Sequence, residues 1–405
     1  MSAPRARPLA LASLLALATL ACQEQLTQPG ECPELCPGGT AETIEEVLQA
    51  LPNGDTSFTG YVARADGGVL LVSSGVPAPA DSNLAVVRFA ARPDSITFRD
   101  TRVVYQIDSI VLGLGLVARD TAVRGVQLHL FRLPSSLDLD NLTFAGVSPL
   151  LTPGSLVATI AVPDTARRDS LTVTLQGSAL DPLVLQPADA GKLVLGVSVD
   201  ASPPAGTGVR LGTGLSNLPP VFTTYVTPIT DLQGATSVPL GVGVEFNNYV
   251  TKNELVPDPS LLTVGGAPSS RALIRFPWPA RLRDSVSIVR ATLELTPVSP
   301  VPGLPHDPGF LEARAILADL GAKSPAVPSA SSSAAVEAGT TGAVGVEVGS
   351  LVQLWQGLDP RPPALFLVMT PEAATFTEAV FGSTRAGTPP QLRVTYLRRF
   401  PFERP

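Results

Sequence analysis

The sequence has few of the side chains, and none of the short motifs, on which most enzymes depend. Two histidines and three cysteines occur in 405 residues, which leaves little material for general-base or metal-ligand chemistry. No G-x-S-x-G, H-E-x-x-H, P-loop or dinucleotide-binding glycine motif occurs. Lysine and arginine number 28 against 35 aspartates and glutamates. Because this balance provides no basic field for phosphates, we expect no nucleic-acid partner.

What the sequence has is a steady alternation of short apolar runs and chain-breaking residues. Hydrophobic residues make up 44% of the chain, and 41 prolines and 35 glycines interrupt them. From residue 55 onward, apolar side chains stand at every second position of the runs, a period typical of strands with one buried face. The sequence therefore predicts an all-β fold of two tandem antiparallel β-sandwich domains.

Residues 1 to 21 are predicted to be a secretory signal peptide. Arg5 and Arg7 precede an uncharged apolar run that is too short to span a membrane. The Thr-Leu-Ala-Cys stretch that ends at Cys22 resembles the bacterial lipobox, in which the cysteine becomes lipidated and N-terminal after cleavage. Thr19 departs from the leucine most often found there. The resemblance implies a lipoprotein anchored through Cys22, and the alternative is an ordinary signal peptide with an accidental cysteine.

The residue after Cys22 bears on the destination of the protein. An aspartate there would resemble the inner-membrane retention signal of Gram-negative bacteria, but the chain has Gln23. The absence of that aspartate favours the outer membrane, to which the N-terminal lipid would attach the protein. We therefore expect an exported, lipid-anchored protein of a Gram-negative cell envelope.

Residues 22 to 54 are predicted to be a tether that ends in a short helix. Cys32 and Cys36 suit a local disulfide in an exported chain. A zinc site is the weaker alternative, because no second cysteine pair or nearby histidine accompanies them. The helix is predicted from apolar residues at helical spacing ahead of Pro52, namely Ile44, Val47, Leu48 and Leu51.

Two halves of the chain repeat the same order of elements. NLAVVRFAARPDSITFRDTRVVYQIDSIVLGLGLV parallels PSSRALIRFPWPARLRDSVSIVRATLELTP, and each half closes on a Pro-Pro pair and a final strand. We predict a duplication, with β-sandwich 1 at residues 55 to 228, β-sandwich 2 at residues 229 to 399 and a tail at 400 to 405. The Ala/Ser-rich stretch 321 to 345 is predicted to be a long mobile loop of the second sandwich rather than a linker between domains.

The second half also resembles a known family. Its matching pieces are ALIRF at 272 to 276, VSIVRATLEL at 286 to 295, VGSLVQLWQG at 348 to 357 and FGSTRAGTPPQLRVTY at 381 to 396. They are similar to the strand-and-turn pattern of the DNRLRE-type β-sandwich domain of bacterial surface proteins. The resemblance implies a fold like the carbohydrate-binding jelly rolls and a surface location. The hexapeptide that names the family is absent, and no ligand-binding residue is carried over.

Two residue pairs are candidate binding groups. Asp138 and Asp140 are expected on one side of an extended strand, where their oxygens suit a structural calcium ion; a solvent-facing strand edge is the default. No other cofactor is expected. Trp278 and Trp355 are the only tryptophans, and tryptophan rings stack on sugars. Trp278, between two prolines, is the better exposed candidate, whereas a buried core position is favoured for Trp355.

Two classes of function remain. The lack of a catalytic constellation, the duplication and the predicted anchor favour a non-enzymatic envelope lipoprotein that binds a glycan or protein or has a structural role. The alternative is a secreted hydrolase or lyase acting on polysaccharide, with carboxylates such as Asp138, Asp307 or Glu312, because acid–base pairs need no sequence motif.

We expect the mature protein to begin at a lipidated Cys22. Mass spectrometry of the N-terminal peptide from the native host should find acyl groups on this residue, and Cys22→Ser should release the protein from the membrane fraction. Cleavage at another position, or an unmodified Cys22, would contradict the lipoprotein interpretation.

Overall fold

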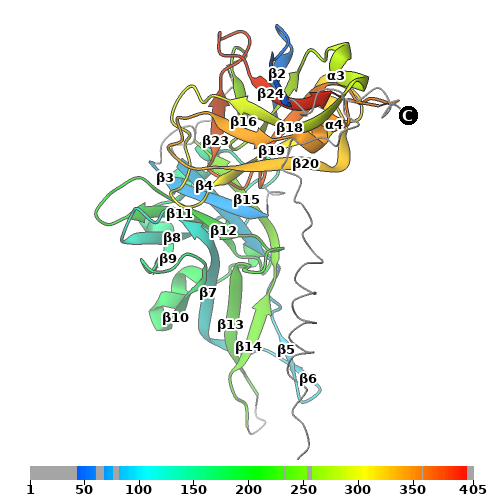
Figure 1. Cartoon of the computed structure of the whole chain (residues 1–405). Coiled ribbons are helices and arrows are strands. Elements are labelled where there is room, and N and C mark those ends of the chain that lie inside the picture. The colour runs from blue at the N-terminus through cyan, green and yellow to red at the C-terminus, as the bar shows by residue number, and fades with distance from the viewer. Residues whose placement is uncertain are drawn as a thin grey trace, which may run out of the picture.

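Antiparallel strands dominate the part of the chain that the computed structural model describes, which comprises residues 43–60, 68–75, 82–230, 234–252, 258–357 and 359–398. The strands form two lobes that follow one another along the long axis of the molecule (Figure 1). The predicted all-β class with antiparallel sandwich sheets is confirmed. The signal peptide and Cys22, Cys32 and Cys36 lie outside the described residues.

The first lobe is built on one curled sheet of eleven strands. Alternate side chains of its longest strand, from Ile110 to Leu116, are buried in a core to which both layers of the curl contribute. The strand order is β14 (Val238–Val242), β13 (Val221–Pro228), β7 (Tyr105–Arg119), β12 (Thr207–Gly212), β3 (Val69–Ser74), β4 (Ser82–Phe89), β11 (Val194–Ala201), β8 (Val126–Leu133) and β9 (Leu156–Ala161), with β10 (Asp169–Gln176) also paired to β7 and β15 (Val244–Thr251) to β4.

The second lobe has two sheets that enclose one core. Leu293 from one sheet and Leu367 from the other belong to the same buried cluster, so the sheets form a sandwich. The smaller sheet has the order β1 (Thr43–Gln49), β24 (Gln391–Arg398), β18 (Val286–Leu295) and β21 (Val344–Glu347). The larger has the order β20 (Ala326–Val336), β19 (Gly309–Ile316), β22 (Ala364–Thr370), β17 (Ser270–Arg275), β16 (Leu262–Gly265) and β23 (Glu378–Phe381), with β2 (Asp55–Thr59) also on β17.

Short elements connect these strands. No helix in the described ranges is long and apolar enough to cross a bilayer. The connecting elements are the hairpin β5 (Ile96–Phe98) and β6 (Thr101–Val103), the helices α2 (Phe144–Val147), α3 (Ala280–Asp284) and α4 (Gly349–Gln353), and the 3-10 turns η2 (Ser148–Leu150), η3 (Pro153–Ser155), η4 (Gly177–Leu183), η5 (Pro187–Asp189) and η6 (Gly321–Lys323).

The predicted helix near the start is wrong, because these residues form β1 and pair with β24 along their whole length. Ile44 and Leu48 share a face in a helix and in a strand alike, so their spacing does not distinguish the two. Val47 and Leu51 do distinguish them. A helix would bury both beside Ile44 and Leu48, whereas they are 43% and 37% exposed.

The Ala/Ser-rich stretch 321 to 345 is not a mobile loop. Its residues 326 to 336 form β20, an edge strand against β19, and β21 begins at Val344. Ala330 and Ala334 pack on the core at alternate positions. The period of two was present in the sequence, but small side chains with low strand propensity carried it.

The boundaries of the two sandwiches also need correction. β2, assigned to the first sandwich, pairs with β17 in the second lobe. β14 and β15, assigned to the second sandwich, pair with β13 and β4 in the first lobe. Periodicity identifies the buried face of a strand but does not identify its partner, so the sequence could not place these strands.

The two lobes contact each other through a mixed polar and apolar interface. Arg210 Nη1 in β12 donates to both carboxylate oxygens of Asp307 at 2.7 and 3.0 Å. The hydroxyl of Tyr249 in β15 donates to the Ala373 carbonyl at 2.8 Å. Ala374 and Phe376, from the second lobe, pack against the core of the first. Side chains of the second lobe are therefore buried in the core of the first lobe.

Glu378, two residues after Phe376, is a buried carboxyl in this region. Its side chain is 6% exposed and packs over Gly266, where an added Cβ would lie 1.8 Å from the Glu378 Oε2. Burial raises the pKa of the Glu378 carboxyl from 4.5 to about 7, because the charged form loses its hydration. The folded protein therefore holds a proton at Glu378 that the unfolded chain releases at lower pH.

We expect Glu378→Gln to stabilise the protein at alkaline pH but not in acid. A carboxyl whose pKa is raised by folding costs nothing below about 4.5, and its cost grows with pH until about 7. The difference 7 − 4.5 = 2.5, at 1.36 kcal/mol per pKa unit, sets an upper limit of about 3 kcal/mol. Urea unfolding should show that the free energy of unfolding of the wild type falls between pH 4.5 and pH 8 by up to this amount, and that this decrease is absent in the variant. Equal pH dependence of the two proteins would contradict the assignment.

Candidate functional site

Asp138 and Asp140 lie in the turn after β8, which corrects their predicted position on an extended strand. Asp138 Oδ1 accepts hydrogen bonds from the backbone N–H groups of Asp140 and Asn141 at 3.1 and 3.3 Å, and Oδ2 accepts one from Asn141 Nδ2 at 2.9 Å. The hydrogen bonds, that from the Asn141 side chain first, lower the pKa of Asp138. The carboxylate thus fixes a turn. Across the described ranges no group of three or more His, Cys, Asp or Glu side chains is placed to hold a metal ion.

The two tryptophans meet in the core of the second lobe. Trp355 is 1% exposed, and Trp278 is partly buried against the same cluster. Their rings make an edge contact with centroids 5.1 Å apart, and Phe276 stacks on Trp355 at 6.3 Å. Burial excludes Trp355 from stacking on a sugar, and Trp278 is engaged in the aromatic cluster.

The candidate catalytic carboxylates lie in separate places. Asp307 pairs with Arg210 between the lobes. Glu312 in β19 accepts two hydrogen bonds from Arg314 at 3.0 and 2.9 Å, which lower its pKa. Asp138 fixes the turn of the first lobe described above. These three side chains therefore do not form an acid–base pair across a bound substrate.

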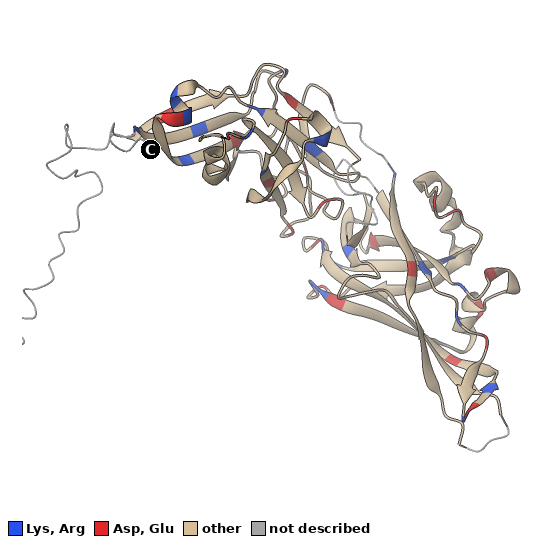
Figure 2. Ribbon diagram, turned by 90° about the vertical axis from the view of Figure 1, so that its right-hand side faces the viewer, with Lys and Arg blue, Asp and Glu red and all other residues tan. Residues whose placement is uncertain are grey.

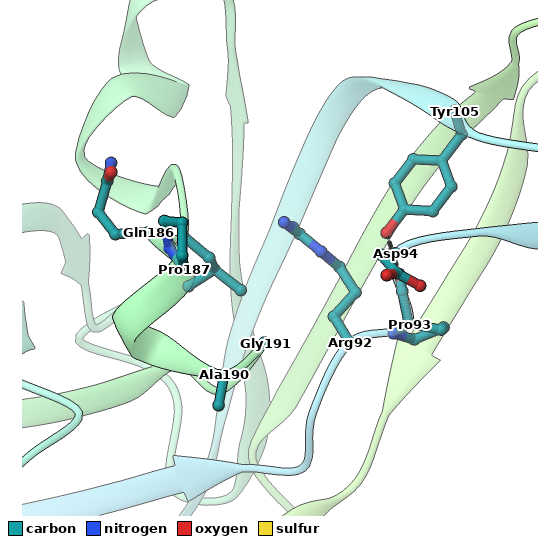
Figure 3. Close-up of a pocket in the computed structure, with 9 residues that line it drawn as sticks. Arg92, Pro93, Asp94, Tyr105, Gln186, Pro187, Ala190 and Gly191 are labelled. Carbon is teal, nitrogen blue, oxygen red and sulfur yellow. Dashed lines mark hydrogen bonds between the residues drawn. The ribbon is translucent and has the colours of Figure 1, made fainter.

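The first lobe contains a hollow between the β4–β5 connection and η5 (Figure 3). Its volume of about 640 Å³ lies within the range of small-ligand sites. One wall comes from residues that precede and follow the β5–β6 hairpin, and the other comes from η5 and its flanks. The lining residues are Arg92, Pro93, Asp94, Tyr105, Leu185, Gln186, Pro187, Ala190 and Gly191.

Backbone contacts hold the two walls together. The Arg92 N–H donates to the Gly191 carbonyl at 2.9 Å. Gly191 has a φ of +77°, and a Cβ there would lie 2.9 Å from the Arg92 carbonyl oxygen, so this position requires glycine. Ala190, with a φ of 49°, caps η5 in the left-handed region. The reversal after η5 thus sets the width of the hollow.

Two side chains give the hollow its chemical character. The Tyr105 hydroxyl donates to the Pro93 carbonyl, which fixes the ring against the wall. The Arg92 side chain lies between the walls in Figure 3, and its Nη1 is enclosed without a hydrogen-bond partner among the described residues. A buried donor without a partner is costly, so Arg92 is ready to donate to an oxygen atom of a ligand.

Acidic and amide groups complete the site. Asp94 is 94% exposed and lies 3.4 Å from Arg102 Nη2 at the rim. Gln186 stands on the opposite wall. Its backbone N–H donates to Asp189 Oδ2 at 2.6 Å, which is a contact behind the wall. The hollow therefore offers a cation, a carboxylate, an amide and a fixed aromatic ring.

A second, smaller hollow lies on the other side of η5. It measures about 410 Å³ and is lined by Arg132 and Asp189, among others. Arg132 already donates to the Pro182 and Val184 carbonyls and, at 2.6 Å, to Asp189. Burial pushes the pKa of Asp189 upward, but hydrogen bonds from Gln186, Ser135 and Arg132 outweigh it, and the net pKa is lowered. These groups satisfy one another and position η5.

Little in the amino-acid sequence indicates the larger hollow. Arg92-Pro93-Asp94 and Gln186-Pro187 are polar residues at chain breaks, as many surface loops are. They come from connections more than ninety residues apart. Nothing in the local pattern shows that the two connections meet.

Charge is dispersed over the molecule. In the view of Figure 2, basic and acidic residues are interspersed on both lobes. Several arginines are paired with carboxylates, for example Arg271 with Glu372 and Arg275 with Asp319. The Arg92 guanidinium, with its partnerless nitrogen, differs from these.

Comparisons with known proteins do not assign a family. No family model and no curated protein matches the chain. A solved structure, the C-terminal domain of the Streptococcus pyogenes antigen I/II-family protein AspA, aligns over 89% of this chain and 92% of its own length, with 9% identity and a TM-score of 0.11. Such a low score carries no argument about fold or function.

Proposed function

We propose that this protein is a non-enzymatic lipoprotein of the cell envelope whose first lobe binds a glycan. The observation that carries the proposal is the enclosed, partnerless Arg92 Nη1 beside Tyr105 in a hollow of about 640 Å³. A ligand that supplies an acceptor oxygen there would satisfy a donor that the folded chain leaves unpaired.

The groups around the hollow fit the chemistry of a sugar. Sugar hydroxyls donate and accept, and Asp94, Gln186 and Arg92 provide matching acceptors and donors. The Tyr105 ring adds an apolar surface for C–H groups. An acidic sugar fits best, because its carboxylate would form a charge-assisted hydrogen bond with the Arg92 guanidinium.

The predicted N-terminus supports an envelope location. A lipid on Cys22 would anchor the chain, and Gln23 favours the outer membrane. The resemblance of residues 240 to 398 to DNRLRE-type surface domains supports the same location. Binding of a protein through the same hollow, or a structural role, is less favoured than glycan binding, because the lining is rich in polar groups suited to hydroxyls.

A polysaccharide hydrolase or lyase is the alternative. Glycosidases of the common type hold two carboxyl groups about 5 to 9.5 Å apart across the substrate. The lining of the larger hollow carries one carboxylate, Asp94, and that of the smaller carries Asp189, which is paired with Arg132. The two linings therefore favour binding over hydrolysis.

We expect Arg92→Ala to weaken binding of an acidic oligosaccharide, such as an oligogalacturonide, by about tenfold or more, because a charge-assisted hydrogen bond is lost. Isothermal titration calorimetry with the soluble chain would measure the affinity. A glycan array containing neutral and acidic sugars would first define the preferred ligand.

Arg168→Ala is the matched control, because Arg168 is exposed on the same lobe and does not line the hollow. This variant should bind like the wild type. Equal affinities of the two variants would refute the site, and release of reducing ends from the oligosaccharide would favour the hydrolase.

A further inference from the structure

The two lobes repeat the same pattern of strand pairing. Within the described ranges, and without the β5–β6 hairpin, β1–β13 and β14–β24 contain eleven strands each. The ladder β3-β4-β11-β8-β9 is matched by β16-β17-β22-β19-β20. β7 pairs with β10 and β13, as β18 pairs with β21 and β24. The duplication seen in the sequence therefore extends to the ladders.

The first two strands of each repeat lie in the lobe formed by the other repeat. β1 and β2 begin the first repeat, yet they pair with β24 and β17 of the second. β14 and β15 begin the second repeat, yet they pair with β13 and β4 of the first. Each lobe thus contains nine strands of one repeat and two of the other.

The two donated strands β2 and β15 occupy equivalent registers. Asp55 in β2 lies opposite Ile274, and Asn247 in β15 lies opposite Val87. Ile274 and Val87 are the third residues of ALIRF and AVVRF, the matching strands of the two repeats. The equivalence therefore extends to single residues.

The same two side chains make the same anchoring contact. Asp55 Oδ2 accepts a hydrogen bond from the Thr384 N–H at 2.7 Å, and Asn247 Oδ1 accepts one from the Gly214 N–H at 3.0 Å. Thr384 and Gly214 are the fourth residues of the matching turns FGST and LGTG. Asp55 is fully buried and also accepts from the Thr384 hydroxyl at 2.6 Å. Each lobe thus recognises its donated strand through one side-chain acceptor and a ladder.

The turns that receive these acceptors are built alike. Ser383 and Thr213, at the third position of each turn, donate to the carbonyls of Ser260 and Gly68, which precede β16 and β3. Each turn is therefore held by a contact within its own repeat, and this contact does not involve the donated strand. We call the turn and the strand that pairs with the donated strand the seat.

We propose that the two repeats have exchanged their first strand pairs. We also propose that β24 of the smaller sheet and β17 of the larger sheet form a binding site for residues 43–59, which the same segment of a second copy of this chain can also occupy. The contacts that hold this segment are backbone ladders, the Asp55 anchor and ion pairs of Glu45 and Glu46 with Arg393 and Arg281. None of them depends on the covalent link between β2 and β3.

A second copy is the natural alternative donor, because it carries the identical segment. Only residues 60 to 68 join β2 to β3, so the segment is connected to its own repeat by a short link and seated in the other. Exchange of an identical element between copies is a low-cost route to dimers. The alternative occupant that we assign is therefore segment 43–59 of a second copy, which would replace the molecule's own segment.

Cysteine cross-linking of the full chain tests this proposal. Glu45 and Thr395 are directly opposite in the β1–β24 ladder and at least partly exposed, which suits a cross-strand disulfide. With the three native cysteines changed to serine, a chain carrying both Glu45→Cys and Thr395→Cys should form a cross-linked monomer. Equal amounts of the two single variants, refolded together, should form a cross-linked dimer.

The control replaces Thr395→Cys by Thr172→Cys, an exposed position on β10 of the first lobe. We expect at least about tenfold more dimer from the paired positions than from the control mixture. A double variant that does not cross-link would refute the seat. A double variant that does cross-link, with mixtures that give equal dimer, would refute the second copy as donor.

The anchor can be tested by hydrogen exchange in residues 55–59 of the full chain. Asp55→Ala should speed exchange of these amides by about tenfold or more, because the Thr384 donors lose their acceptor. Asp55→Asn should stay within about threefold of the wild type, because Asn247 fills the equivalent place in the first lobe with an amide. Equal effects of alanine and asparagine would overturn the equivalence of the two seats.

Discussion

The buried carboxylate of Asp55 ties the beginning of the described chain to its end, and the closure of the second lobe depends on this contact. Asp55 and Thr384 are 329 residues apart, and their hydrogen bonds measure 2.6 and 2.7 Å. A buried carboxyl group is tolerated only when its oxygens accept hydrogen bonds, and here a backbone N–H and a hydroxyl donate to them, with Arg385 Nη1 3.8 Å away. Removing β2 would therefore leave the turn at Thr384 with donors unpaired and β17 without one neighbour.

This constraint also explains why the lobes are not independent. In the first lobe, Asn247 makes the corresponding contact from β15. Each lobe is therefore completed by two strands of the repeat that forms most of the other lobe. The pair Arg210–Asp307 and the hydroxyl of Tyr249 add direct contacts between the lobes. Tyr249 itself sits on the donated strand β15, so the exchange and the interface share a residue. The orientation of the lobes is set by segments that belong to both.

The alternation of apolar residues was enough to predict the fold class, and the internal repetition was enough to match β4, β7 and β13 with β17, β18 and β24. Local pattern failed where it does not distinguish two structures. Ile44 and Leu48 fit a helix and a strand equally, and only their partner strand decided between them. In β20, alanine and serine gave the strand period without strand propensity. The pairing partner of a strand could not be predicted, because the sequence of a strand specifies which face is buried and not which neighbouring strand it pairs with.

The candidate site also could not be located from the sequence alone. The sequence analysis singled out the two tryptophans of the second repeat, whereas the hollow lies at the corresponding place in the first repeat. Trp278 follows β17, and Trp355 precedes β22; their edge contact fills the space between these two connections. In the first repeat the corresponding connections, after β4 and before β11, supply Arg92 and η5. Arg92 and the flanks of η5 leave that space open, and the β5–β6 hairpin inserted after Arg92 brings Tyr105 to its wall. Duplication thus gave two copies of one junction. One is closed by the packing of Trp278 against Trp355, and the other stays open beside the Arg92 guanidinium, which is why we propose the binding role for the first lobe.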